Sequence, residues 1–258
     1  MYAQRDSFLH RLNPLSKIAA TAPAVIFLAL STEPFTPAPF VVFGAVVTLA
    51  LGNVPPRAYL RATAPLLLAM AGLALLYPFA VSSAATAGSR VVLDVGWIEL
   101  REAGVVLGLS AALRILAVFA LTLMFVLTTD PPDFARALVQ QCGLPYRLGY
   151  VAVAAYRLVP RFAANVRTIR AAHMVRGAKG GFGGAYERLR RYSVPLLAGA
   201  VRHAERVALA MDSRAFGAHD RRTYLRRLRL ARPDLAFVTL FWLASLALVL
   251  LLRLPGTP

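Results

Sequence analysis

Acidic residues and cysteine are both scarce in this 258-residue sequence. It has 12 Asp and Glu residues against 29 Lys and Arg residues, a formal net charge of +17, and one cysteine, Cys142. A single cysteine excludes a disulfide within the chain. Charged residues make up only 16% of the sequence, whereas about a quarter is usual for soluble domains. Because 58% of the residues are hydrophobic and the mean hydropathy is +0.60, the composition indicates a membrane protein.

Recognisable sites for metals, nucleotides and catalysis are also missing. The four histidines have no spacing with cysteine or carboxylates that suits a metal ion, and there is no nucleophile elbow or carboxylate pair. The glycine-rich segment 177–184 (GAKGGFGG) lacks the spacing of a phosphate-binding loop, so a turn is the better interpretation. We therefore expect no metal, no cofactor and no ATP hydrolysis by this chain.

What the sequence does have is five apolar runs that can cross a membrane, which takes about 20 helical residues. The expected spans cover about 15–31, 36–52, 62–81, 105–129 and 235–252. The first 17 residues are polar, so we expect no cleavable signal peptide, and the first span would act as the insertion signal. Arg114 lies inside the fourth span, where we expect it to face other helices or a polar cavity, most simply as a structural contact.

The basic residues are concentrated between the fourth and fifth spans. Residues 130–232 hold 20 of the 29 Lys and Arg residues and 6 of the 12 acidic residues, so this segment carries +14 of the +17. The loops on the opposite side have few basic residues, and the positive-inside rule therefore places the amino terminus and the basic segment in the cytoplasm. The predicted division is a membrane region at 1–129, a cytoplasmic region at 130–232, and a last span with its tail at 233–258.

Two long amphipathic helices are predicted inside the basic region. In the first, over 145–177, one face of the helix carries Leu148, Val151, Ala155, Leu158, Phe162, Val166 and Ile169. In the second, over 185–216, the stripe is Leu189, Tyr192, Leu196, Ala200, Ala204, Val207 and Met211. The predicted fold class is all-α: a polytopic membrane protein with about five transmembrane helices and a cytoplasmic insert of long crossed amphipathic helices before the last span.

Each long helix ends in a similar short motif. The first is Ala172-His173-Met174-Val175-Arg176-Gly177, and the second is Ala210-Met211-Asp212-Ser213-Arg214-Ala215-Phe216-Gly217. In a single helix, the arginine would do no more than complement the negative end of the helix dipole, worth about 0.3–1 kcal/mol. Two such endings on two long helices instead favour a shared functional role.

With these motifs the sequence resembles the transmembrane coupling component (T component, EcfT/CbiQ type) of energy-coupling factor (ECF) transporters, which import vitamins and transition-metal ions into prokaryotes. The two endings are similar to that family's two Ala-Arg-Gly motifs, and Asn13–Lys17 (NPLSK) resembles its amino-terminal Pro-x-x-Lys segment. Val175 stands where alanine is usual, and Ser213 and Ala215 replace alanine and glycine. The resemblance covers almost the whole chain.

The resemblance implies that the two helix ends are coupling helices that lie in grooves of one or two ABC-type ATPase subunits, which bind the ATP. Arg176 and Arg214 would pair there with acidic groups, because guanidinium offers carboxylates a rigid fork of donors. The coupling residues that it implies are Ala172, Val175, Arg176, Gly177, Ala210, Met211, Asp212, Ser213, Arg214, Ala215 and Gly217. It also implies a small membrane-embedded substrate-binding (S) subunit, contact with membrane lipid, and the prokaryotic cell (inner) membrane as location.

Two other classes of function fit parts of the pattern. A membrane enzyme acting on anionic lipid headgroups would gather its substrate with the basic region, and the purified chain would then turn over without partners. A membrane-tethered nucleic-acid binder would show steeply salt-dependent affinity and aromatic stacking positions. The long apolar stripes call for packing partners, so no nucleic acid is expected. The transported substrate, whether cobalt, nickel or a vitamin, stays open because another subunit of such transporters binds it.

Overall fold

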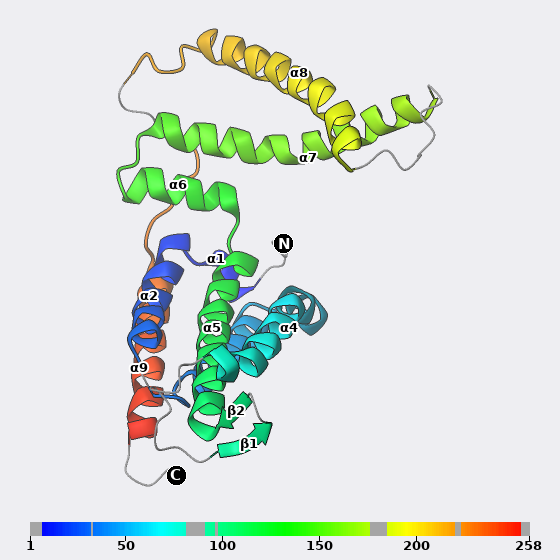
Figure 1. Ribbon diagram of the computed structural model, residues 1–258. Helices are drawn as coiled ribbons and strands as arrows, with labels where there is room; N and C mark the ends of the chain where they lie inside the picture. The colour runs from blue at the N-terminus through cyan, green and yellow to red at the C-terminus, as the bar shows by residue number, and fades with distance from the viewer. Residues whose placement is uncertain are drawn as a thin grey trace. The chain divides into compact units, whose positions relative to one another are not determined.

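The computed structural model describes residues 7–31, 33–80, 91–95, 98–175, 185–219 and 223–253, and most of these residues are helical (Figure 1). The chain forms two compact units. We call Met1–Phe134 together with Leu228–Pro258 the apolar unit, and Ala135–Arg227 the basic unit. The predicted all-α class of a polytopic membrane protein is confirmed, with three described helices long and apolar enough to cross a membrane where about five spans were expected. The division at 129 and 232 remains a prediction about membrane topology.

Five apolar helices make up most of the described part of the apolar unit. The three that are long and apolar enough to cross a membrane are α4 (Pro56–Ala80), α5 (Glu102–Thr128) and α9 (Arg232–Arg253). The shorter ones are α2 (Pro14–Leu30) and α3 (Pro37–Val46), which continues into a π-helical turn, η1 (Val47–Leu51). One short helix, α1 (Phe8–Arg11), precedes α2. Residues 15–31 and 36–52, expected as spans, thus correspond to the two shorter helices.

A two-stranded hairpin precedes α5 and was not predicted. Strand β1 (Val91–Val95) pairs antiparallel with β2 (Ile98–Arg101), and Val95 lies opposite Ile98. Strand β2 leads directly into α5. Both strands are short, and β1 has three valines and β2 one isoleucine, residues that favour a pleated conformation. The segment is flanked by two strong helical runs, which dominate the pattern.

Helix α5 packs against α4, α3 and α2, and α2 also packs against α9 (Figure 1). Small residues permit these close approaches, as is typical of helices in membranes. A Cβ added to Gly44 of α3 would lie 3.1 Å from the Cβ of Ala120 on α5, and one added to Gly108 of α5 would lie 3.2 Å from the carbonyl oxygen of Ala74 on α4. Large side chains fill the remaining core, including Leu28, Phe40, Leu121, Met124 and Phe241.

Polar side chains on the apolar helices mostly bond to their own backbone. The hydroxyls of Thr21, Thr48 and Thr63 each donate to the carbonyl four residues earlier, at 3.0, 2.7 and 3.1 Å. Such bonds satisfy a hydroxyl that has no water nearby. Arg114 is half-buried on α5, and its Nε atom is buried without a hydrogen-bond partner among the described residues. The buried Nε agrees with the expectation that this arginine faces other helices.

The basic unit is built on a pair of long helices, α7 (Tyr146–Val175) and α8 (Ala185–Asp212), which follow α6 (Pro131–Gln141). Three contacts fix their register. The rings of His173 and Tyr192 are 5.7 Å apart, Nη1 of Arg161 lies 3.3 Å from Nε2 of His203, and the rings of Tyr150 and Phe216 are 5.0 Å apart. Residue numbers rise along one helix as they fall along the other, so the helices are antiparallel, and Figure 1 shows them crossing.

The predicted apolar stripe of α7 is only partly used for packing within the chain. Its second half, from Leu158 to Ile169, is half-buried as expected. Its first half stays exposed: Leu148 is 58% and Val151 57% exposed, while Gly149 and Val153 on the neighbouring face are the more buried residues. The stripe of α8 is half-buried from Tyr192 to Met211 except at Ala204; the side chain of Leu189 lies outside the described part.

Candidate functional site

The second motif forms a defined turn at the end of α8. The Phe216 amide donates to the Met211 carbonyl at 3.0 Å, and the Ala215 amide donates to the Asp212 carbonyl at 2.9 Å. These two bonds form a Schellman cap, which requires a left-handed residue between them. Ala215 takes that position with φ +53°, and Gly217 has φ +93°. The sequence predicted a helix to Phe216 that Gly217 closes, but the α-helix already ends at Asp212, and 213–217 form the turn.

The first turn of α7 holds this cap in place. The Tyr146 hydroxyl donates to the His219 carbonyl at 2.9 Å, and the Arg147 guanidinium donates to the Gly217 carbonyl at 2.9 Å. The Phe216 ring packs against Tyr146, at 5.6 Å between centroids, and against Tyr150. Sequence reasoning missed the role of Tyr146, Arg147 and Tyr150, because their partners lie about 70 residues away and leave no periodic signal.

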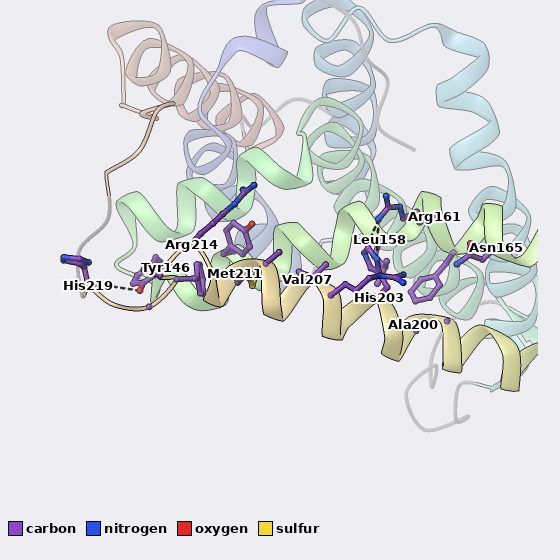
Figure 2. A pocket seen from close by; sticks show the side chains of 18 of the residues that line it. Tyr146, Leu158, Arg161, Asn165, Ala200, His203, Val207, Met211, Arg214 and His219 are labelled. Atoms are coloured by element: carbon purple, nitrogen blue, oxygen red, sulfur yellow. Dashed lines mark hydrogen bonds between the residues drawn. The ribbon is translucent and has the colours of Figure 1, made fainter.

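A cleft of about 740 Å³ runs between α7 and α8 and ends at this cap. Figure 2 shows Arg214, Met211 and Tyr146 toward one end of it, and Arg161, His203 and Asn165 toward the other. The residues that line it include three arginines and two histidines but no Asp or Glu among the described residues. Such a basic surface attracts anionic groups.

Arg214 lies at the centre of the cap and is exposed. Its guanidinium makes no hydrogen bond or ion pair to another described residue, so it is available to a partner. Ser213 and Ala215 beside it are small and exposed, while Met211 is half-buried toward α7. A fixed turn with small neighbours therefore presents one unpaired guanidinium, which suits a bidentate contact with a carboxylate.

The first motif lies at the opposite end of the helix pair. Ala172 and Val175 are on the last turn of α7, and Val175 is 89% exposed. Arg176 and Gly177 lie outside the described residues. The pairing of His173 with Tyr192 places the end of α7 beside the start of α8, roughly 35 Å along α7 from the contact of Tyr150 with the α8 cap. The structure therefore does not bring the two motifs together into one site.

Comparison with known proteins gives consistent matches along the chain. Residues 5–225 match the family model CbiQ, described as cobalt transport protein. The chain is 27% identical over 245 residues to the energy-coupling factor transporter transmembrane protein EcfT of Thermosediminibacter oceani, which covers 91% of this chain and 90% of the relative. It is 25% identical over 258 residues to the protein of the same name from Bacillus subtilis, covering 95% and 94%.

A third relative is built differently. The chain is 28% identical over 244 residues to a protein of Bifidobacterium longum that is provisionally named an ABC transporter ATP-binding protein. The match covers 90% of this chain but only 30% of that relative. Most of that longer protein thus lies outside the part that resembles this chain.

Proposed function

The chain belongs to the CbiQ family of cobalt transport proteins, and from this premise we propose that it is the energy-coupling membrane subunit of an ATP-driven ECF-type importer. As a transporter component of the EcfT type it is not an enzyme, which removes the lipid-headgroup enzyme considered from the sequence. In our proposal it transmits movements of ATPase subunits to a separate membrane subunit that binds the substrate.

One observation carries the proposal: the exposed guanidinium of Arg214, which has no partner among the described residues, on a cap that α7 holds in place. A mobile tail that ends in arginine can bind an acidic groove, but it cannot pass on a displacement. A cap fastened by two hydrogen bonds and two ring contacts moves together with the helix pair. We propose that Arg214, with Ala210, Met211, Asp212, Ser213, Ala215 and Gly217, occupies a groove of an ATPase subunit.

The separation of the two motifs supports contact with two ATPase subunits. They lie roughly 35 Å apart along α7, too far for one groove to hold both helix ends. In the proposal, Ala172, Val175, Arg176 and Gly177 at the end of α7 occupy the second groove. The relative from Bifidobacterium longum supports an ATPase partner, because a protein named for ATP binding there contains a segment similar to this chain.

Exposed apolar residues on the helix pair support a further membrane partner. Leu148, Val151 and Val159 on α7 are more than half exposed, as are Val194, Leu197 and Val201 on α8. We propose that the S subunit and lipid cover these faces. Closure of the ATPase pair would then shift the helix pair only because ATP-bound ATPases bind one arrangement of it better than another.

The substrate and the location are proposed on the same basis. The importer would carry a vitamin or a transition-metal ion, and the description of the family as cobalt transport protein makes cobalt the first ion to test. The chain would lie in the prokaryotic cell (inner) membrane. Its amino terminus and basic unit would be in the cytoplasm, because the basic loops of membrane proteins lie on the cytoplasmic side and the basic residues of this chain concentrate in the basic unit. ATP would be bound by the partner subunits alone.

Reversing the charge of Arg214 tests the proposal. We expect Arg214→Glu to lose one of the two copurifying ATPase subunits of the same organism, because a carboxylate repels the acidic groove at this helix end while the end of α7 still binds the second subunit. Arg214→Lys should retain less ATPase than the unchanged chain, since a point charge does not reproduce the bidentate fork. The measurement is the amount of ATPase retained per chain in detergent.

Arg202→Glu is the matched control. Arg202 lies on α8, the helix that leads into the cap, and is exposed, but it is not among the residues that line the cleft. It changes the net charge equally and should copurify normally. Equal retention of the ATPase by Arg214→Glu and Arg202→Glu would overturn the proposal.

A further inference from the structure

The end of α5 and the start of α9 both contact the same turn of α2. The segment between them holds α6, α7 and α8. The turn is Asn13–Lys17, at the beginning of α2. Its polar side chains are buried, although a helix start that served only as a membrane boundary would normally be left to water.

Lys17 binds the end of α5 to the first turn of α2. Its side chain is 1% exposed, and its Nζ atom donates to the Thr128 carbonyl at 2.8 Å, the Thr128 hydroxyl at 3.3 Å and the Thr129 hydroxyl at 3.2 Å. An ammonium group has three protons, so these bonds use its full capacity. All the acceptors belong to the last residue of α5 and the residue after it.

Asp234 binds the start of α9 to the first turn of α2. It is 3% exposed, and its Oδ1 atom accepts from the Asn13 amide at 2.7 Å and from the Ser16 hydroxyl at 3.1 Å. Its Oδ2 atom accepts from the Ala231 amide at 2.8 Å, so the same carboxylate also caps the beginning of α9. One side chain thus joins the first turn of α9 to the first turn of α2.

Burying an amine and a carboxylate is costly, and apolar residues of similar volume would often stabilise the fold equally well. What the polar groups add is directional contact: each bond fixes one position of the chain against α2. The two positions that are held against α2 are the ends of the segment that carries α7 and α8.

We propose that the Asn13–Lys17 turn is a two-sided anchor that couples the basic segment mechanically to α2. Lys17 and Asp234 act as positioning residues, and displacement of either end of the segment pulls on the same turn of α2. This inference rests on the proposed coupling function for its purpose, but the anchor itself can be tested without any partner.

Hydrogen exchange in the full chain tests the anchor. Lys17→Met keeps the length of the side chain and removes all three donors, so exchange should become about tenfold faster at residues 128–134. Asp234→Asn should have the same effect at 231–235. Thr129→Val removes one acceptor and should give a smaller increase in the exchange rate at 128–134. It replaces Lys17→Met in the test if Lys17→Met does not fold.

Thr122→Val is the matched control, because the Thr122 hydroxyl bonds only within α5, to the Val118 carbonyl at 2.8 Å, and Thr122 is exposed. It should leave exchange at both junctions unchanged. Unchanged exchange at both junctions in Lys17→Met and Asp234→Asn, or an increase spread evenly over α4 and α5, would overturn the anchor.

The coupling role is tested in the complex with ATPase subunits, by exchange with and without ATP and vanadate. We expect ATP and vanadate to change exchange in α7, α8 and α2 of the unchanged chain, and in Lys17→Met to change it in α7 and α8 but no longer in α2. An equal change of α2 in both proteins would overturn the coupling role of the anchor. If α7 and α8 of the unchanged chain do not respond, the proposed function itself is wrong, and the exchange at the junctions still decides whether the anchor exists.

Discussion

Ala215 adopts a left-handed backbone conformation that glycine adopts at less cost. Its φ of +53° is required by the Schellman cap, and an L-residue with a Cβ pays about 1–2 kcal/mol there. The cap carries the exposed Arg214, so the strain lies beside the residue that we propose to contact the ATPase. In the sequence, the only sign of this left-handed position was that the second motif of the family usually has glycine where this chain has Ala215.

We predict that Ala215→Gly stabilises the end of α8 by about 0.5–1 kcal/mol, because it removes the steric cost and loses part of the gain to the greater freedom of the unfolded chain. Hydrogen exchange of the amides of 213–217 in the full chain measures the effect. Ala208→Gly, at an exposed position within α8, should instead destabilise the helix by about 1 kcal/mol. Destabilisation by both substitutions would contradict the cap.

At the scale of single residues, the sequence predicted the candidate site residues but not the residues that hold them in position. Arg214 was recognised because a repeated local motif surrounds it. Tyr146 and Arg147 were not, since their bonds to His219 and Gly217 join the start of one helix to the turn after the next. Lys17 was recognised as part of a motif, while its bonds to Thr128 and Thr129 depend on the packing of α2 against α5.

The packing of α3 against α5 depends on the absence of a side chain at Gly44. An added Cβ would lie 3.1 Å from the Ala120 Cβ and 3.2 Å from the Ala120 carbonyl carbon, so the backbone of α5 would have to move. Gly72 of α4 is the opposite case, because an added Cβ there would have nothing within 4 Å. Substitutions at the two glycines therefore distinguish the effect of helix packing on stability from the effect of helix propensity.

We predict that Gly44→Leu lowers the free energy of unfolding by about 1–3 kcal/mol or prevents folding, because it overpacks the contact with α5. Gly72→Leu should be neutral or slightly stabilising, since leucine has the better helix propensity. Thermal unfolding of both variants in detergent measures the difference. Equal melting temperatures would show that α3 does not pack on α5 as described.

At the scale of elements, hydrophobic periodicity predicted the helices well and their burial less well. The stripe of α8 from Tyr192 to Met211 packs largely as predicted. The stripe of α7 packs as predicted only from Leu158 to Ile169, because Leu148 and Val151 in its first half stay exposed. Periodicity shows which face of a helix is apolar, but it does not show whether the chain itself, another subunit or lipid covers that face.

The hairpin of β1 and β2 shows a second limit. Its strands are five and four residues long and lie between two long apolar helices. No strand was predicted there, because short strands produce a weak periodic signal, whereas the helical runs on both sides are strong.

For the whole molecule, the central claim is that the two ends of one antiparallel helix pair each engage an ATPase subunit. The basic segment is +14, and the described residues that line its cleft include no acid, which favours an acidic partner surface. The family match and the five apolar helices place the chain in a transporter of the membrane. The separation of the two motifs along α7 then predicts that both ATPase contacts depend on arginines that act independently.

The most direct test is the native mass of the complex formed when the chain is coexpressed with ATPase subunits. The unchanged chain is predicted to carry two ATPase subunits, and Arg176→Glu combined with Arg214→Glu is predicted to carry none while still inserting into the membrane. A double variant that retains both ATPase subunits would contradict the account.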